Sequence, residues 1–227
     1  MWQELVKIWK ADNLLKQAWN TSYEMIEITH EMFLESMKAL RQQEHDKVNK
    51  EIRAKDKKIN KYEREVRRDV LTHLAVQGAK DVPAGLVLIT IIIDIERIGD
   101  YTKNIVELVD ARAETLSAGE YEENLTKVED SIKHVFQQTI ICLRESKQEE
   151  AVQLLFDYKW VNIECDRNLM EIIKNKETGL DSGNAAALAI YFRYLKRIHS
   201  HLRNILTSVV NPFDRIGYKV KKKQLKS

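Results

Sequence analysis

The sequence predicts an all-α protein built from two similar three-helix units, as six long helices in tandem bundles. Helical periodicity dominates, because apolar residues recur at a spacing of about 3.6 positions over most of the chain. Only 7 Gly and 2 Pro occur among 227 residues, so long uninterrupted helices are easily accommodated. The segment 94–104 also has a weak echo 100 positions later, at 194–204. The three observations together favour two three-helix bundles packed side by side.

The first unit is predicted to contain helices over 13–43 and 47–76, and a third helix from Pro83 to about residue 112. Gly78 and Pro83 mark the break before the third helix, because proline is well tolerated in a first helical turn. The β-branched run 86–93 would also suit a buried strand. No turn signal separates this run from the helical pattern that follows, so we interpret it as part of the helix.

The second unit is predicted to contain helices over about 120–145, 148–177 and 183–209. Asn211 precedes Pro212 and should end the last of them, because a residue before proline avoids the helical region. We therefore divide the chain into a first three-helix repeat at 1–113, a second at 114–212 and a basic C-terminal tail at 213–227.

Composition excludes several classes of function. The chain is 44% hydrophobic and 32% charged, which suits a soluble protein with a real core. The formal net charge is +2 and no basic module stands out, so we expect no nucleic-acid partner. Two cysteines without metal-ligand spacing suit a reducing compartment, and neither a secretory segment nor a membrane-spanning run is visible. The expected location is cytoplasmic.

Acidic and amide side chains share one ridge of the helix predicted over 94–104. Glu96 and Asp100 are four residues apart, and Asn104 continues the ridge one turn further. Like charges at this spacing repel by roughly a few tenths of a kcal/mol, which a bound cation would offset. Oxygen ligands of this kind suit Mg, Ca, Mn or iron. Asp56 on the preceding helix would add a ligand if that helix faces the motif.

The same charges also fit an ordinary helix surface. Arg97 lies three residues before Asp100 and Lys103 lies three after it. Surface ion pairs at this spacing contribute less than about 1 kcal/mol each. Spacing alone therefore leaves both the metal site and the solvated helix face open.

The run DIERIGDYTKNI that begins at Asp94, preceded by VPAGLVLITIII, resembles the signature of the PhoU family of phosphate-uptake regulators. Members of that family have two three-helix repeats, each with an acidic motif on its third helix. The resemblance implies a cytoplasmic regulator of phosphate transport and phosphate-starvation signalling that acts by protein-protein contact. Its implied partners are a phosphate transporter and a membrane sensor kinase.

Some family members bind multinuclear iron or zinc clusters through these motifs, which implies a metal site in the first repeat. The residues that match the family's ligands are Glu96, Asp100, Asp56 and Asn104. The second repeat departs from the pattern, since Lys196 and Ser200 stand where carboxylates are expected. The alternative is a metal-free helical adaptor, or an accessory protein of a different phosphate transporter.

An aromatic stripe at helical spacing near the N-terminus contains Trp2 and Trp9. These side chains either pack against the chain's own bundle or contact a partner, which would include a second copy in a homodimer, because aromatic residues are favoured at interfaces. The Lys-rich tail is either a solvated end or a contact for anionic lipid, which would give peripheral membrane association.

The histidines of the sequence do not form a recognisable metal or catalytic site. Glu27 and His30 have the E-x-x-H spacing of ferritin-like enzymes, but that class needs a second such pair, which the chain lacks. His199 and His201 diverge by about 200° on a helix and cannot share a metal, and we predict His199 at the surface or the edge of the core. No nucleophile motif or Gly-rich phosphate loop is present, so we do not expect an enzyme.

Overall fold

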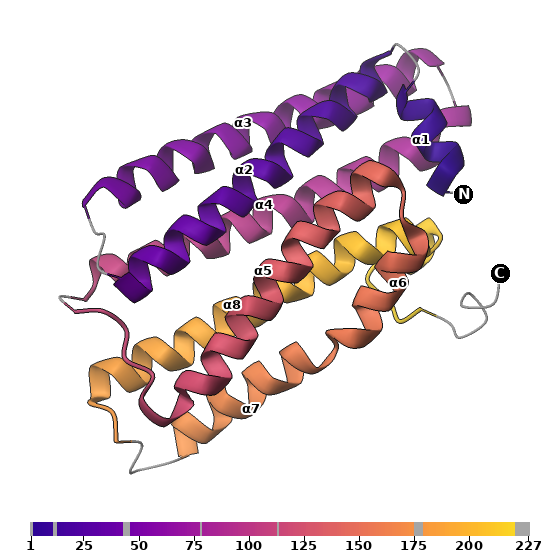
Figure 1. Ribbon diagram of the computed structural model, residues 1–227. Helices are drawn as coiled ribbons and strands as arrows, with labels where there is room; N and C mark the ends of the chain where they lie inside the picture. The colour runs from indigo at the N-terminus through magenta and orange to yellow at the C-terminus, as the bar shows by residue number, and fades with distance from the viewer. Residues whose placement is uncertain are drawn as a thin grey trace.

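The computed structural model describes residues 2–10, 13–42, 46–77, 79–112, 114–174 and 179–220, which are almost entirely helical (Figure 1). The α-helices are α1 (Trp2–Lys10), α2 (Leu14–Gln42), α3 (Asp46–Gln77), α4 (Val82–Asp110), α5 (Glu122–Glu145), α6 (Gln148–Asp157), α7 (Trp160–Lys174) and α8 (Ser182–Val210). Short 3-10 helices lie in the connections: η1 (Ala79–Asp81), η2 (Gly119–Tyr121) and η3 (Phe213–Arg215). No strand occurs within these ranges, so the all-α prediction is confirmed, and the run 86–93 is helical.

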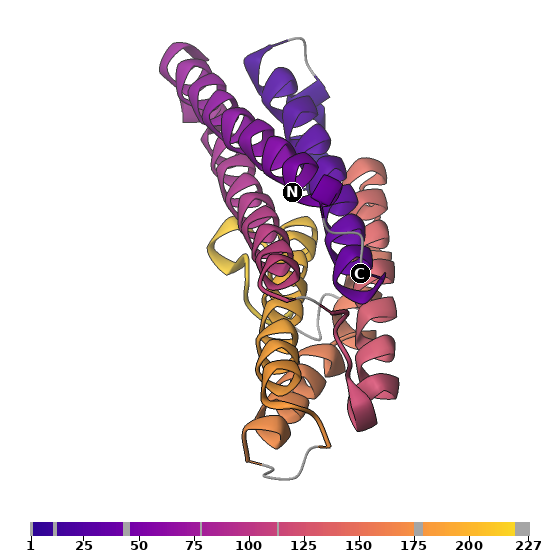
Figure 2. The ribbon, with the colours of Figure 1, turned by 90° about the vertical axis from the view of Figure 1, so that its left-hand side faces the viewer.

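The long helices form two groups that lie side by side. Helices α2, α3 and α4 pack against one another, and we call them the first repeat. Helices α5 to α8 form the second repeat, in which α8 packs against each of the others. The repeats meet where α4 packs on α8 and where α2 packs on α5, and Figure 2 again places α4 next to α8.

The structure departs from the six predicted helices in two places. Residues Trp2–Lys10 form a separate short helix, α1, before the first long one. The helix predicted over 148–177 is divided at Tyr158 and Lys159 into α6 and α7. Tyr158 has φ −103° and ψ 11°, and the break contains neither Pro nor Gly. The usual sequence signals of a helix end are therefore absent there, which is why periodicity did not reveal it.

Local chemistry explains where α4 and α8 begin. Pro83 lies in the first turn of α4, as predicted, because the missing N–H would have had no helical partner there. Asp181 caps α8, since its carboxylate accepts a hydrogen bond from the backbone N–H of Asn184 at 2.9 Å. A cap of this kind stabilises a helix by about 1 kcal/mol. The helix ends at Asn211, which precedes Pro212, also as predicted.

Residues 211–220, which we call the C-terminal strap, fold back against α8. Asn211 is buried, and its side-chain amide donates to two backbone carbonyls of the strap at 2.9 and 3.0 Å. The N–H of Gly217 donates to the hydroxyl of Thr207 at 2.7 Å, and its φ of 84° favours glycine. The part of the predicted tail at 213–227 that the structure describes is thus packed on the protein, and the rest lies outside the described residues.

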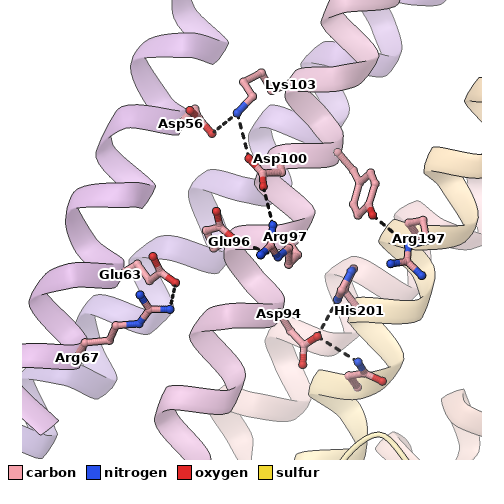
Figure 3. Close-up of polar contacts among 12 residues, drawn as sticks. Asp56, Glu63, Arg67, Asp94, Glu96, Arg97, Asp100, Lys103, Arg197 and His201 are labelled. Carbon is pink, nitrogen blue, oxygen red and sulfur yellow. Dashed lines mark hydrogen bonds and ion pairs between the residues drawn. The ribbon is translucent and has the colours of Figure 1, made fainter. Parts of the chain in front are cut away.

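Helices α4 and α8 run antiparallel, so the two copies of the repeated segment cross each other. Asp94 accepts a hydrogen bond at 2.7 Å from His201, a contact drawn in Figure 3. The rings of Tyr101 and Tyr194 lie 5.9 Å apart between centroids. Asp94 and Tyr194 hold equivalent places in the repeated pattern, and so do Tyr101 and His201. An approximate two-fold axis therefore relates the two contacts, and it is the structural counterpart of the sequence echo.

A buried carboxylate also joins the repeats. Glu129 on α5 is only 5% exposed, and it accepts a hydrogen bond at 2.7 Å from the hydroxyl of Tyr191 on α8. Arg41 on α2 lies 3.7 Å from the same carboxylate. Burial raises the pKa of Glu129, although Tyr191 and Arg41 both oppose the rise. Paired in this way, the carboxylate is accommodated in a region where an isolated charge would be costly.

Candidate functional site

The predicted acidic residues meet along the line where α3 packs against α4, and we use the word groove for this line of contact. Glu96 and Asp100 lie on α4, and Asp56 and Glu63 lie on the facing side of α3 (Figure 3). The structure therefore meets the condition set for Asp56, since its helix faces the acidic motif. Asn104 lies one turn further along α4 and takes no part in the ion pairs of the groove.

Basic residues of the chain neutralise much of this groove. The ammonium of Lys103 lies 3.0 Å from Asp100 and 3.6 Å from Asp56, and so stands between the two helices. Arg97 lies 3.3 Å from Asp100 and 3.6 Å from Glu96. Burial alone would lower the pKa of Lys103, but the hydrogen bonds and charges of Asp100 and Asp56 raise it. Lys103 is therefore held as a cation between two carboxylates.

Glu96 is the least well compensated acid of the groove. Its pKa is raised, first because the side chain is partly desolvated and then because Asp100 repels its charge. Glu63 and Asp56 add smaller repulsions, and Arg97 partly opposes them. The charged form of Glu96 is thus disfavoured first by burial and then by its acidic neighbours.

The ligand types in the groove suit a metal ion, but their arrangement does not. Carboxylate oxygens are the ligands that hard cations prefer. Within the described ranges, however, no group of three or more His, Cys, Asp or Glu side chains is placed to hold a metal ion. The ammonium of Lys103 takes the place between Asp56 and Asp100 that a bound cation would need. The arrangement as it stands does not fit the multinuclear cluster that the family resemblance implied.

The corresponding groove of the second repeat lacks the carboxylates, as the sequence indicated. Lys196 forms an ion pair with Asp166 of α7, where Glu96 of the first repeat faces acidic neighbours. Ser200 accepts a hydrogen bond at 3.0 Å from the side-chain amide of Asn162. The polar contacts at these two positions are therefore a lysine–aspartate ion pair and a serine–amide hydrogen bond.

His199 is fully buried in the second repeat, so its predicted place at the surface or core edge is wrong. Its Nδ1 lies 2.8 Å from the side-chain oxygen of Asn162. Burial lowers the pKa of His199 to about 3, and the nearby positive charge of Arg203 adds to the effect. The ring is therefore neutral at ordinary pH. Sequence periodicity could have placed it, since Ile198 and Leu202 lie on either side of it in the core pattern.

Several other predicted positions have a structural role inside the chain. Trp2 is fully buried, and its ring lies 5.8 Å from that of Trp19. A partner contact through Trp2 would require α1 to leave the core, whereas the side chain of Trp9 lies outside the described part of the structure. Glu27 pairs with Arg144 of α5 and so joins the two repeats.

The fold and this groove define a class of protein: an all-α chain of two similar helical bundles with a charged groove on the first. Comparison with protein-family models matches residues 23–109 to the PhoU domain. Among solved structures, the fold is similar to that of the crystal structure of PhoU from Pseudomonas aeruginosa, with a TM-score of 0.75 and 20% sequence identity. That similarity covers 87% of this chain and 95% of the other. No curated protein sequence matches the chain.

The first repeat is therefore a PhoU domain, and the PhoU fold extends into the second repeat. The family resemblance inferred from the sequence around Asp94 is confirmed. None of the helices in the described ranges is both long enough and apolar enough to cross a bilayer.

Proposed function

We propose that this protein regulates phosphate transport and the response to phosphate starvation through contacts with other proteins. The observation that carries the proposal is the PhoU domain at 23–109, set in a chain whose fold resembles PhoU over most of its length. The sequence carries no recognised nucleophile motif, and the charged residues of the first-repeat groove form an ion-pair network. A regulator that works by binding, in the cytoplasm, fits these features.

An apolar stripe on α7 is the surface that we propose for the transporter or sensor-kinase contact. Ile163, Met170 and Ile173 are 66%, 45% and 63% exposed and follow a helical spacing. Exposed apolar residues that gather on one helix face are typical of protein contact sites. A homodimer and lipid contact by the basic tail stay predictions.

Gene deletion in the native host tests the proposal. We expect the deletion strain to take up phosphate without restraint in rich medium and to express phosphate-starvation genes there. Wild-type protein should restore both, whereas Ile163→Ser with Ile173→Ser should not. The matched control is Leu71→Ser with Val76→Ser, which removes equally exposed apolar groups from the end of α3 and should restore both. Normal uptake and gene expression in the deletion strain would contradict the proposed function.

A second candidate adds a metal to the first repeat. The observation in its favour is the closeness of Glu96 to Asp100: burial raises the pKa of Glu96 most, Asp100 adds a further rise, and a divalent cation would relieve that repulsion. Elemental analysis of protein purified without chelators tests it against the metal-free adaptor. Stoichiometric iron or zinc that is lost in Glu96→Ala with Asp100→Ala would support a metal site. Metal-free protein that restores regulation in the deletion strain would support the adaptor.

A further inference from the structure

A cavity of about 450 Å³ lies in the second repeat, where α6 ends and α7 begins. It is bounded by α8 on one side and by the C-terminal strap on another, and we call it the strap cavity. Its polar lining includes Lys159, Asn162, Ser200, Arg203, Asn204 and Lys219, together with the hydroxyl-bearing Thr207 and Tyr218. Three of these side chains are cationic, and no carboxylate lines the cavity among the described residues.

Two other large cavities of the described structure carry charges of both signs in their linings. The cavity between α2 and α5 is lined by basic residues together with Glu122 and Glu129. The cavity beside η2 is lined by Lys174 together with Glu120 and Glu171. The strap cavity therefore differs from both, because its cations have no acidic neighbour in the lining.

Comparison with the first repeat explains how the imbalance arises. Gly99 faces Ile59 of α3, since a Cβ on Gly99 would lie 3.4 Å from that side chain. The equivalent of Gly99 in the repeated pattern is His199, which faces Asn162 of α7. Ile59 and Asn162 therefore hold matching places on the second helices of the two repeats, which sets the register between α3 and α7.

This register pairs the groove of the first repeat with the strap cavity of the second. Lys159 stands at the place of Asp56, and Ser200 stands at the place of Asp100. Arg203 stands at the place of Lys103, so the cation is kept while both of its carboxylate partners are lost.

Arg203 is half-buried in this setting without a carboxylate partner. One guanidinium nitrogen donates to the backbone carbonyl of Leu155 at 2.8 Å, which leaves other N–H groups of the fork free to bind. Burial is the cause that lowers the pKa of Arg203, but an arginine stays charged in proteins. A partly desolvated charge without a counter-ion is costly, and an anion from solution would offset that cost.

The wall behind Arg203 is rigid and contributes no negative charge. The hydroxyl of Ser200 donates to the carbonyl of Lys196 at 2.8 Å, so it accepts the hydrogen bond from the amide of Asn162. The amide oxygen of Asn162 then faces Nδ1 of His199, which must carry the ring proton. The side chains behind Arg203 are therefore held in place by hydrogen bonds between neutral groups.

We propose that the strap cavity binds a phosphate-class oxyanion, held by Arg203, Lys159 and Lys219. The planar guanidinium presents paired N–H donors that match two oxygens of such an anion, and the lysines add point charges. The anion supplies the negative charge that Asp56 and Asp100 supply to Lys103 in the first repeat. The inference rests on the cavity alone and does not depend on the proposed regulatory partners.

Calorimetric titration of the full chain with inorganic phosphate, in chloride buffer, tests the proposal. We expect binding with a Kd of about 1 mM or tighter. Lys159→Gln with Lys219→Gln should weaken it by about tenfold or more, because two charge-assisted contacts are lost. Both lysines are exposed, so folding should be unaffected. The control, Lys57→Gln with Lys80→Gln, removes the same charge from exposed sites outside the cavity and should bind as the wild type does.

Ser200→Asp is the decisive second variant, because it returns to Arg203 the carboxylate that Asp100 gives to Lys103. We expect it to fold, as checked by circular dichroism, and to lose phosphate binding. If this variant does not fold, the lysine pair and its control still decide the question.

The oxyanion could be free phosphate or the phosphate of a lipid headgroup, and sedimentation with vesicles separates these sources. Phosphatidylcholine vesicles with roughly one fifth phosphatidic acid should pull down wild-type protein, but not the Lys159→Gln, Lys219→Gln variant, if the site takes a headgroup. Binding to free phosphate without vesicle binding would assign the free ion. Failure to bind either probe, or binding that the cavity variants leave unchanged, would overturn the proposal, and the gene-deletion result would be unaffected.

Discussion

The two repeats use the same scaffold and place opposite charges upon it. In the first repeat, the ammonium of Lys103 lies between Asp56 and Asp100 on facing helices. In the second repeat, Arg203 occupies the matching place beside Ser200 and Lys159. One groove is neutralised from within, and the other keeps an excess of positive charge.

The apolar positions of the repeated pattern show the opposite behaviour. Ile98 and Ile105 are fully buried in α4, and their counterparts Ile198 and Ile205 are fully buried in α8. Close packing constrains these side chains, because losing even one methylene from a core is felt. Groove residues are partly solvated, so their charge can change sign at little cost to the fold. The comparison teaches that the buried apolar positions indicate the shared architecture, whereas the charges of the groove indicate how the two repeats differ in binding.

The largest expected effect comes from breaking the contact where the two copies cross. Asp94 accepts hydrogen bonds from His201 at 2.7 Å and from Asn204 at 3.1 Å. Asp94→Ala should lower the free energy of unfolding by about 2 to 3 kcal/mol, because two donors lose a partly buried acceptor. Urea denaturation measures the change. Tyr194→Phe, at the symmetry-related place, keeps the ring contact and should change stability by less than about 0.5 kcal/mol; equal losses would argue against the assigned roles.

Acid should act on the second repeat through His199. Its pKa is about 3 in the folded protein and about 6.5 when the chain is unfolded. The unfolded chain therefore binds a proton below pH 6.5 that the folded chain does not, so stability falls as pH decreases toward 3. Between pH 7.5 and pH 5 the loss from this group should be about 2 kcal/mol.

His199→Gln removes this titration and should reduce the acid-dependent loss by that amount in urea unfolding at the two pH values. His134→Gln is the control, because His134 is exposed on α5 and the substitution there should leave the loss unchanged. An identical pH dependence in His199→Gln and wild type would show that the ring is not held neutral.

The different charges around Lys103 and Arg203 predict different losses of stability when each cation is removed, and these losses are smaller than the effects above. Lys103→Met should destabilise the protein by about 1 kcal/mol at neutral pH, because Asp56 and Asp100 lose their shared cation. Arg203→Met removes a cation that has no carboxylate partner, so the loss should be smaller than for Lys103→Met. Unfolding in low and high salt checks the cause, since screening should reduce the Lys103→Met effect. A larger loss for Arg203→Met would contradict the proposed inversion.

The sequence predicted the long helices well, because apolar periodicity is read directly from the chain. Whether Asp56 lies near Glu96 and Asp100 was left open by the sequence, because it depends on which face α3 turns toward α4, and the structure places Asp56 beside Asp100 through Lys103. The break at Tyr158 escaped prediction because no Pro or Gly marks it. The burial of His199 could have been predicted from its place between Ile198 and Leu202 in the core pattern, but its contact with Asn162 depends on how α7 lies against α8, which local spacing does not encode.

The smallest expected effect concerns Gly99, the first-repeat counterpart of His199. A glycine inside a helix costs about 1 kcal/mol relative to alanine, unless close packing forbids a side chain. The nearest atom to a Cβ on Gly99 belongs to Ile59 and would be 3.4 Å away, which is an ordinary contact. Gly99→Ala should therefore stabilise the protein by up to about 1 kcal/mol in urea unfolding. Gly85→Ala is the matched control on the same helix, because its Cβ would lie 2.9 Å from Val70 and 3.0 Å from Leu74, so it should destabilise the protein or change it little. A clear loss of stability in Gly99→Ala would mean that the first-repeat groove needs the bare backbone at this position, and that the two repeats differ there in more than the side chain they carry.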